Sequence, residues 1–204
     1  MMTNVLIIGA TGSLGQVVRQ YLLEHTNDKL RLMARDVSSI QNIDPEREQT
    51  IQGSVTDQGV LFSAMENIDA VFASLRGDMA KMAQALVDGM NEAGLRRLIF
   101  VTSLGIYNEV PEEIDPQGNL KDKPVLRDYR HAADIVESSG LNYVILRPGW
   151  FDDGDDTDYQ LTSKGEPFVG HDISRKSIAD LVMRLTDDPG FGVRQSYGIS
   201  RKTF

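Results

Sequence analysis

Three features of the sequence predict an α/β fold of the Rossmann type, with a doubly wound, mainly parallel sheet and helices on both faces. Apolar runs of strand length recur along the chain, segments with helical periodicity separate them, and a glycine-rich turn follows the first run. Continuous apolar strands that alternate with helices are typical of a parallel sheet covered on both sides. At 204 residues the chain has the size of one compact domain, so we expect residues 1–204 to form a single domain.

The apolar runs predict five strands and two weaker ones. The strong runs lie at residues 5–8, 30–34, 70–73, 98–101 and 143–146, and the weaker ones near 50–52 and 196–199. Between the runs, apolar side chains recur at the spacing of one helix face. Two such stripes are Leu14, Val17, Val18, Tyr21 and Leu22, and Met79, Met82, Ala83, Leu86, Val87 and Met90. We interpret the methionines as core-filling residues.

Two segments interrupt the alternation, at residues 105–123 and 150–172. Ligands of open α/β sheets bind beyond the carboxyl ends of the strands, so we expect these loops to form the substrate site. The second loop carries Asp152, Asp153, Asp155, Asp156 and Asp158. This run lacks the spacing and the final glutamate of a calcium-binding EF-hand, and the three histidines are widely scattered. We therefore interpret the aspartates as a solvated loop and expect no metal.

Composition excludes several classes of function. The chain has no cysteine, which rules out disulfides, thiolate nucleophiles and sulfur-rich metal sites. Its net charge of −9 repels the phosphate backbone of nucleic acids. No apolar run approaches the ~20 residues of a membrane helix, and the first residues lack the basic region and cleavage site of a secretory signal. We therefore expect a cytoplasmic protein with a small-molecule substrate and no nucleic-acid or membrane partner, with homo-oligomerisation left open.

The most specific motif is the glycine-rich turn Gly9-Ala-Thr-Gly12-Ser-Leu-Gly15, which lies between the first apolar run and an amphipathic helix. In this context one glycine permits a tight turn, one lets the backbone approach a pyrophosphate, and one lets the helix pack closely on the strand. The free amides at the helix start then face the phosphates. We expect this turn to bind a nicotinamide dinucleotide through Gly9, Thr11, Gly12, Ser13, Leu14 and Gly15.

The end of the second strand bears on the choice of cofactor. About twenty residues beyond the turn, an NAD site presents an acidic side chain to the ribose 2′-hydroxyl. Here Arg35 comes first, and an arginine binds a 2′-phosphate bidentately, which favours NADP. Ser38 and Ser39 are further candidate donors, whereas Asp36 keeps NAD open as the alternative.

The glycine spacing resembles that of the atypical and extended short-chain dehydrogenases/reductases, in particular the NAD(P)H-binding group that includes NmrA-like proteins and flavin or biliverdin reductases. The resemblance extends through the segments at 53–57, 74–77, 139–149 and 170–180. It implies that the residues after successive strands contact the cofactor: Ser54, Val55, Ser74, Leu75, Arg76, Thr102, Pro148, Gly149 and Trp150. Trp150 is equally well explained as a residue that closes the core.

The catalytic pair of that family, Tyr-x-x-x-Lys, is missing. Alignment on the Ser-Gly-Leu segment at 139–141 places Leu126 at the tyrosine position and Arg130 at the lysine position. Tyr129 is followed four residues later by Ala133 instead of a lysine. The remaining catalytic candidates are Ser103, which matches the family's serine after the fifth strand, and Arg130, which is always charged and is a poor proton donor. Tyr107 is a further candidate hydroxyl.

These features together predict an NADP(H)-dependent oxidoreductase, a reductase that transfers hydride to a small conjugated acceptor such as a flavin, a quinone or a carbonyl compound. Such acceptors tolerate the absence of the tyrosine because solvent supplies the proton. A non-catalytic NAD(P) sensor of the NmrA-like kind is the alternative, since fold and cofactor site do not establish turnover. A sugar epimerase or dehydratase, which manages protons at tetrahedral carbons, is less well supported.

Overall fold

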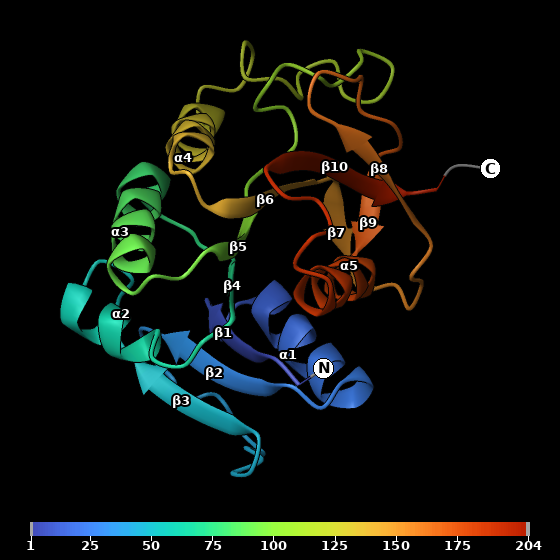
Figure 1. Cartoon of the computed structure of the whole chain (residues 1–204). Coiled ribbons are helices and arrows are strands. Elements are labelled where there is room, and N and C mark those ends of the chain that lie inside the picture. Colours follow the sequence, from blue (N-terminus) through green and yellow to red (C-terminus); the bar gives the residue numbers. More distant parts are fainter. Residues whose placement is uncertain (1, 203–204) are drawn as a thin grey trace.

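A computed structural model describes residues 2–202 of the chain and confirms the Rossmann-type α/β fold. Within these residues, eight strands form one sheet in the order β3-β2-β1-β4-β5-β6-β10-β8 (Figure 1). The strands are β1 (Asn4–Ile8), β2 (Lys29–Ala34), β3 (Glu48–Gln52), β4 (Ala70–Ala73), β5 (Arg97–Val101), β6 (Asn142–Pro148), β8 (Tyr159–Ser163) and β10 (Gln195–Arg201). Neighbouring strands are parallel from β3 to β10, whereas the edge strand β8 runs antiparallel to β10.

The helices cover the sheet in two layers, as the apolar stripes predict. Helices α1 (Ser13–His25) and α5 (Arg175–Asp187) pack against one face, where Val18 and Leu185 are fully buried. Helices α2 (Gln58–Ala64), α3 (Met79–Glu92) and α4 (Leu126–Ser138) cover the other (Figure 1). No helix among residues 2–202 is both long and apolar enough to span a bilayer.

The segment 150–172 differs from the loop that its sequence predicts. It contains β7 (Trp150–Asp152) and β8, and β7 pairs in parallel with β9 (Asp172–Ser174) to form a separate two-stranded sheet. Apolar and polar side chains do not alternate clearly in these short strands, so the hydrophobic periodicity of the sequence does not predict them. The consequence for the site is that Trp150, at the start of β7, lies on a strand and not on a free loop.

Candidate functional site

The glycine-rich turn is shaped by two close backbone approaches. Gly9 has φ +87°, and a Cβ placed on it would come within 2.1 Å of the Ser74 carbonyl oxygen. A Cβ on Gly15 would come within 2.2 Å of the Gly9 carbonyl oxygen. Both positions therefore exclude any side chain, as expected where the turn after β1 packs under the start of α1 and beside the end of β4.

The first turn of α1 leaves its backbone donors free. Asp57, Asp78 and Ser174 cap the N-termini of α2, α3 and α5 with their side chains, whereas the N-cap residue of α1 is Gly12, which has no side chain to accept a hydrogen bond. Within residues 2–202, no protein acceptor takes the N–H groups of the residues that follow, Ser13, Leu14 and Gly15. Free amides at the positive end of a helix dipole form an anion site, and the turn is shaped to accept a pyrophosphate.

Arg35 and Asp36, at the end of β2, differ in whether their side chains are hydrogen-bonded. Arg35 is exposed, and within the described part of the chain it forms no hydrogen bond or ion pair. The Asp36 carboxylate instead accepts the backbone N–H of Ser38 at 2.9 Å, and hydrogen bonds from Ser38 lower the pKa of this carboxyl below its ordinary value. The guanidinium is thus available to a ligand, whereas the carboxylate is engaged in its own turn.

The other residues that the family resemblance assigns to the cofactor lie beyond the carboxyl ends of β3 to β6. Ser54 bonds Thr56 through its hydroxyl, Val55 is buried, and the Ser74 N–H donates to the carbonyl of Ile8 on β1. The side chains of Leu75 and Arg76 are half-buried and exposed, respectively. Parallel strands bring these segments to one edge of the sheet, next to the glycine-rich turn.

At the ends of β5 and β6 the backbone is fixed by contacts with neighbouring strands. Thr102 donates both its N–H and its hydroxyl to the Leu146 carbonyl, at 2.8 and 3.1 Å. The Gly149 N–H donates to Ile199 on β10, and a Cβ on Gly149 would come within 2.3 Å of the His171 carbonyl oxygen. The Thr102 hydroxyl is therefore used within the fold, and Gly149 allows β6 to pass close to the segment before β9.

A cavity of about 410 Å³ opens beyond these two strand ends. Its polar side chains are Ser103, Tyr129, Lys123 and Asp115. Its other walls come from Leu104, Gly118, Val125, Leu126, Pro148, Gly149 and Trp150. An apolar cavity with a few polar groups that converge on it is the usual form of a small-molecule site.

Ser103 and Tyr129 are the two hydroxyl groups of this cavity. The Ser103 hydroxyl donates to the neighbouring Leu104 carbonyl at 3.2 Å, a weak contact that a ligand can replace. Tyr129 lies one turn of α4 beyond Leu126, so both side chains occupy the same helix face. The Tyr129 hydroxyl forms no hydrogen bond within residues 2–202. Two hydroxyl-bearing side chains therefore line the same cavity.

Arg130 pairs along its own helix. Its Nε donates to Asp134 at 2.9 Å along α4, and its guanidinium lies 4.8 Å from the ring centroid of Tyr107. It is absent from the walls of the cavity that contains Ser103. Tyr107 is also engaged elsewhere, because its hydroxyl donates to Glu137 at 2.8 Å. The fold thus groups Ser103 with Tyr129 instead of Arg130.

A buried ion pair fixes the first residues of the segment 105–123. Arg147 of β6 and Glu109 pair with fully or almost fully buried side chains. The same Glu109 carboxylate accepts the N–H groups of Gly105 and Tyr107, at 3.2 and 2.9 Å. A carboxylate with so many donors ties this segment to β6, next to Ser103.

Lys123 and Trp150 form the outer wall of the cavity. The Lys123 ammonium lies 3.0 Å from an Asp115 oxygen and 5.4 Å from the Trp150 ring centroid, so that it bridges 105–123 and β7. Contact with Lys123 lowers the pKa of Asp115. Tyr129, Lys123 and Asp115 were not predicted as site residues. The i, i+3 spacing from Leu126 to Tyr129 was a signal for Tyr129, whereas nothing in the sequence places Lys123 or Asp115 beside Trp150.

The acidic run is paired with basic side chains and is not merely a solvated loop. Arg201 contacts Asp152 and Asp156, while Arg175, Lys176 and Lys202 contact Asp153, Asp155 and Asp158. Among residues 2–202, no group of three or more histidine, aspartate or glutamate side chains has an arrangement that could hold a metal ion.

Comparisons with known proteins agree with this geometry. The family model described as NAD(P)H-binding matches residues 9–189. A solved Rossmann-fold NAD(P)-binding family protein from Shigella flexneri is 36% identical, covers 100% of this chain and 99% of its own, and has a TM-score of 0.85. A wide-type short-chain dehydrogenase/reductase from Veillonella parvula, solved in complex with NADP, is 26% identical with full coverage of both chains and a TM-score of 0.87.

A curated relative from Bacillus subtilis (strain 168), named an uncharacterized sugar epimerase, is 23% identical over 94% of each chain. The family match spans the glycine-rich turn, the ends of β3 to β6 and the whole of α5. The match to the Shigella protein covers the whole chain at an identity that is typical of a shared family. The chain therefore belongs to the NAD(P)H-binding family of Rossmann-fold proteins.

Proposed function

We propose that this protein is an NADP(H)-dependent reductase that transfers hydride to a small conjugated carbonyl compound, quinone or flavin. The observation that carries the proposal is the cavity beyond β5 and β6, whose mainly apolar lining includes the hydroxyl-bearing side chains of Ser103 and Tyr129. The same strand edge carries the glycine-rich turn, so cofactor and acceptor would meet there.

The residues present fit a dinucleotide phosphate. The uncapped amides of Ser13, Leu14 and Gly15 would hold the pyrophosphate. Arg35 would bind the 2′-phosphate of NADP, since its guanidinium is exposed and Asp36 is engaged by Ser38. The NADP in the Veillonella relative supports this choice over NAD. When bound, the reduced nicotinamide supplies the hydride.

Ser103 and Tyr129 would act on the acceptor oxygen. Two hydroxyl donors in a partly dehydrated cavity polarise a carbonyl and stabilise the negative charge that develops on its oxygen. Tyr129 would then donate its phenolic proton to that oxygen. It would take the role of the family's tyrosine, which is absent at position 126, from a position one helical turn later. Leu104, Leu126 and Pro148 exclude water from the same space. For an acceptor that takes up its proton from solvent, the hydroxyls would only bind and orient it.

A sugar epimerase is the second candidate, because the Bacillus relative carries that name. An epimerase oxidises and re-reduces one substrate, so the cofactor is regenerated in each turnover. The apolar walls formed by Val125, Leu126 and Trp150 favour a planar acceptor over a sugar with many hydroxyls. Net consumption of NADPH separates the two functions.

The test is a titration with NADPH and with NADH, followed by acceptor-dependent oxidation of the bound cofactor. We expect tighter binding of NADPH, and loss of its absorbance when 1,4-naphthoquinone, FMN or an aromatic aldehyde is added. Binding without oxidation by any of these acceptors would favour a non-catalytic sensor. Absence of binding to either dinucleotide would contradict the cofactor assignment itself.

A further inference from the structure

Arg201, the last residue of β10, lies among three carboxylates. Its guanidinium donates to Asp152 at 2.7 and 3.0 Å and to Asp156 at 3.0 and 3.1 Å, and it also pairs with Asp172. These hydrogen bonds raise the pKa of Arg201 and lower the pKa of Asp156, whereas the pKa of Asp152 is lowered first by the Gly154 N–H and then by Arg201. One cation therefore holds together acidic groups that would otherwise repel one another.

The backbone around this cation is closely fitted. A Cβ on Gly154 would lie 2.7 Å from an Asp156 oxygen, 3.0 Å from an Asp152 oxygen and 3.1 Å from Arg201 Nη2. The Gly154 N–H donates to Asp152 at 2.8 Å. Residues 152–156 thus wrap around the guanidinium, and a side chain at position 154 would have to displace these carboxylates or the guanidinium.

The same contacts link Arg201 to the wall of the cavity. Asp152 ends β7 and Asp172 begins β9, so Arg201 bridges both strands of the two-stranded sheet. In that sheet Trp150 pairs with Asp172, and its N–H donates to His171 at 3.0 Å. β10, which ends at Arg201, also accepts the Gly149 N–H through Ile199. A continuous path of contacts therefore joins Arg201 to the backbone at Trp150.

We infer that Arg201 is a positioning residue for the acceptor, which acts by holding β7 and therefore Trp150 against the cavity. This inference rests on the proposed function in so far as that cavity receives the acceptor. Loss of the guanidinium would leave the three carboxylates uncompensated, and their repulsion would move β7 away from Lys123 and the cavity.

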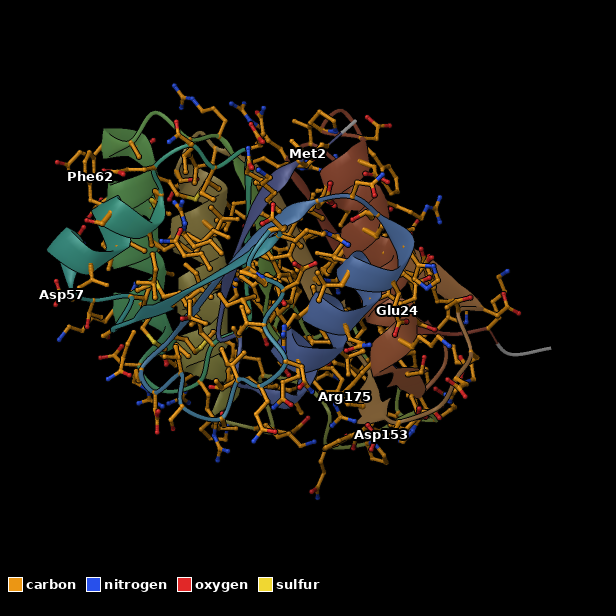
Figure 2. All side chains as sticks on the ribbon, turned by 90° about the horizontal axis from the view of Figure 1, so that it is seen from below. Met2, Glu24, Asp57, Phe62, Asp153 and Arg175 are labelled. Atoms are coloured by element: carbon orange, nitrogen blue, oxygen red, sulfur yellow. The ribbon has the colours of Figure 1, made fainter. Side chains whose placement is uncertain are left out.

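The other ion pairs of the segment provide matched controls. Asp153 pairs with Arg175, and Asp155 pairs with Lys176. Figure 2 shows Asp153 and Arg175 close together at the edge of the molecule, near α1. The side chains of Asp153 and Asp155 are 90% and 99% exposed, so solvent and salt screen these pairs. Asp155→Asn removes a carboxylate from the same segment without touching Arg201.

The experiment compares the wild type with Arg201→Met, Arg201→Lys and Asp155→Asn. Trp150 is the only tryptophan in the sequence, so tryptophan emission and its quenching by acrylamide report on this wall without any turnover. In Arg201→Met a multidentate charge-assisted contact is lost, so we expect about twofold greater quenching and a roughly tenfold higher KM for 1,4-naphthoquinone. The affinity for NADPH should change by less than about threefold, because this contact lies far from the glycine-rich turn. Arg201→Lys should restore part of both effects, and Asp155→Asn should match the wild type.

Unchanged quenching and KM in Arg201→Met would overturn the inference. So would parallel losses in folding, NADPH affinity and kcat without a selective change in KM, because these would indicate general support of the fold. If Arg201→Met does not fold, Asp152→Asn weakens the contact between the guanidinium and β7 while it keeps an acceptor for the Gly154 N–H, and wild-type quenching in this variant would count against the inference. If the wild type binds NADPH but reduces no acceptor, the proposed function fails while the quenching result still decides the role of Arg201 in placing Trp150.

Discussion

The carbonyl oxygen of Ser74 lies 2.1 Å from the position that a Cβ on Gly9 would occupy. The turn after β1 and the end of β4 are therefore in backbone contact at the point where the family places the cofactor. This contact explains why the position admits glycine alone, for reasons of space as well as of its φ of +87°.

Gly9→Ala should abolish NADPH binding and lower the stability of the fold. The added methyl must push the end of β4 away from the turn, at a cost of about 3 kcal/mol or more for overpacking combined with backbone strain. Thermal unfolding and NADPH fluorescence measure the two effects. Gly140→Ala is the matched control, because Gly140 has φ +73° but no atom within 4 Å of its Cβ position. It should lose only about 1 kcal/mol and retain NADPH binding; equal behaviour of the two variants would refute the steric argument.

Arg35→Ala should reduce the preference for NADPH over NADH. A charge-assisted contact with a phosphate is worth about 1.5–3 kcal/mol, which corresponds to a roughly tenfold to hundredfold weaker affinity for NADPH. Affinity for NADH should stay within about twofold, since NADH has no 2′-phosphate. Calorimetric titration with both dinucleotides measures the ratio. Arg96→Ala, which removes an exposed arginine at the opposite end of the sheet, should leave the ratio unchanged. An unchanged ratio in Arg35→Ala would remove the basis for assigning NADP.

Tyr129→Phe and Ser103→Ala should each lower kcat for an aromatic aldehyde by about 10²-fold, the usual contribution of one positioned acid or hydrogen-bond donor. NADPH affinity should be preserved, because neither side chain belongs to the glycine-rich turn. Tyr107→Phe removes a hydroxyl that bonds Glu137, so it should keep kcat. Steady-state kinetics of the three variants decide the assignment. Wild-type kcat in Tyr129→Phe would show that solvent supplies the proton.

Glu109→Gln should destabilise the fold by about 3 kcal/mol, because it leaves Arg147 buried without a counter-charge. Chemical denaturation measures the free energy of unfolding. Asp134→Asn breaks the exposed pair between Arg130 and Asp134 on α4 and should cost no more than about 0.5 kcal/mol. Similar losses in the two variants would show that the buried pair has no special role in tethering the segment 105–123.

Asp28 should make stability fall as the pH rises. Its side chain is buried, its Oδ2 has no partner within residues 2–202, and burial raises its pKa above the ordinary value of 3.8. A raised pKa in the folded state means that the folded protein binds the proton more tightly than the unfolded chain. This contribution is complete below the unfolded pKa and is lost as the pH rises through the folded pKa. Asp28→Asn keeps the acceptor for the Thr3 N–H and should raise stability at pH 7 by about 1 kcal/mol. A less stable variant at pH 7 would contradict this reasoning.

Much of the fold could be predicted because its signals are local. Buried parallel strands such as β1 and β5 are continuous apolar runs, and the glycine-rich turn is a contiguous motif. β7 and β9 escaped prediction because they have three residues each and are fixed by contacts with distant parts of the chain. Arg201, which bridges them, is about 50 residues from Asp152 in sequence.

The site was predictable only in part for the same reason. Residues next to a strand end, such as Ser103 and Gly149, follow directly from the strand assignment. To identify Tyr129, one must know which face of α4 turns toward the cavity. To identify the pair of Lys123 with Asp115, one must know how the segment 105–123 crosses the edge of the sheet. Arg130 occupies the family's lysine position in the alignment, yet its side chain pairs with Asp134 along the helix. Side-chain direction on a helix is set by packing, which sequence spacing alone does not determine.

The most direct test of the reductase assignment follows the hydrogen itself. Samples of NADPH carrying deuterium on one or the other face of nicotinamide C4 are oxidised by the protein with 1,4-naphthoquinone, and the recovered NADP⁺ is examined by mass spectrometry. A nicotinamide fixed between the glycine-rich turn and the cavity predicts transfer from a single face, so that one label is lost and the other is retained. Equal loss of both labels, or no oxidation of NADPH by any acceptor, would contradict the account.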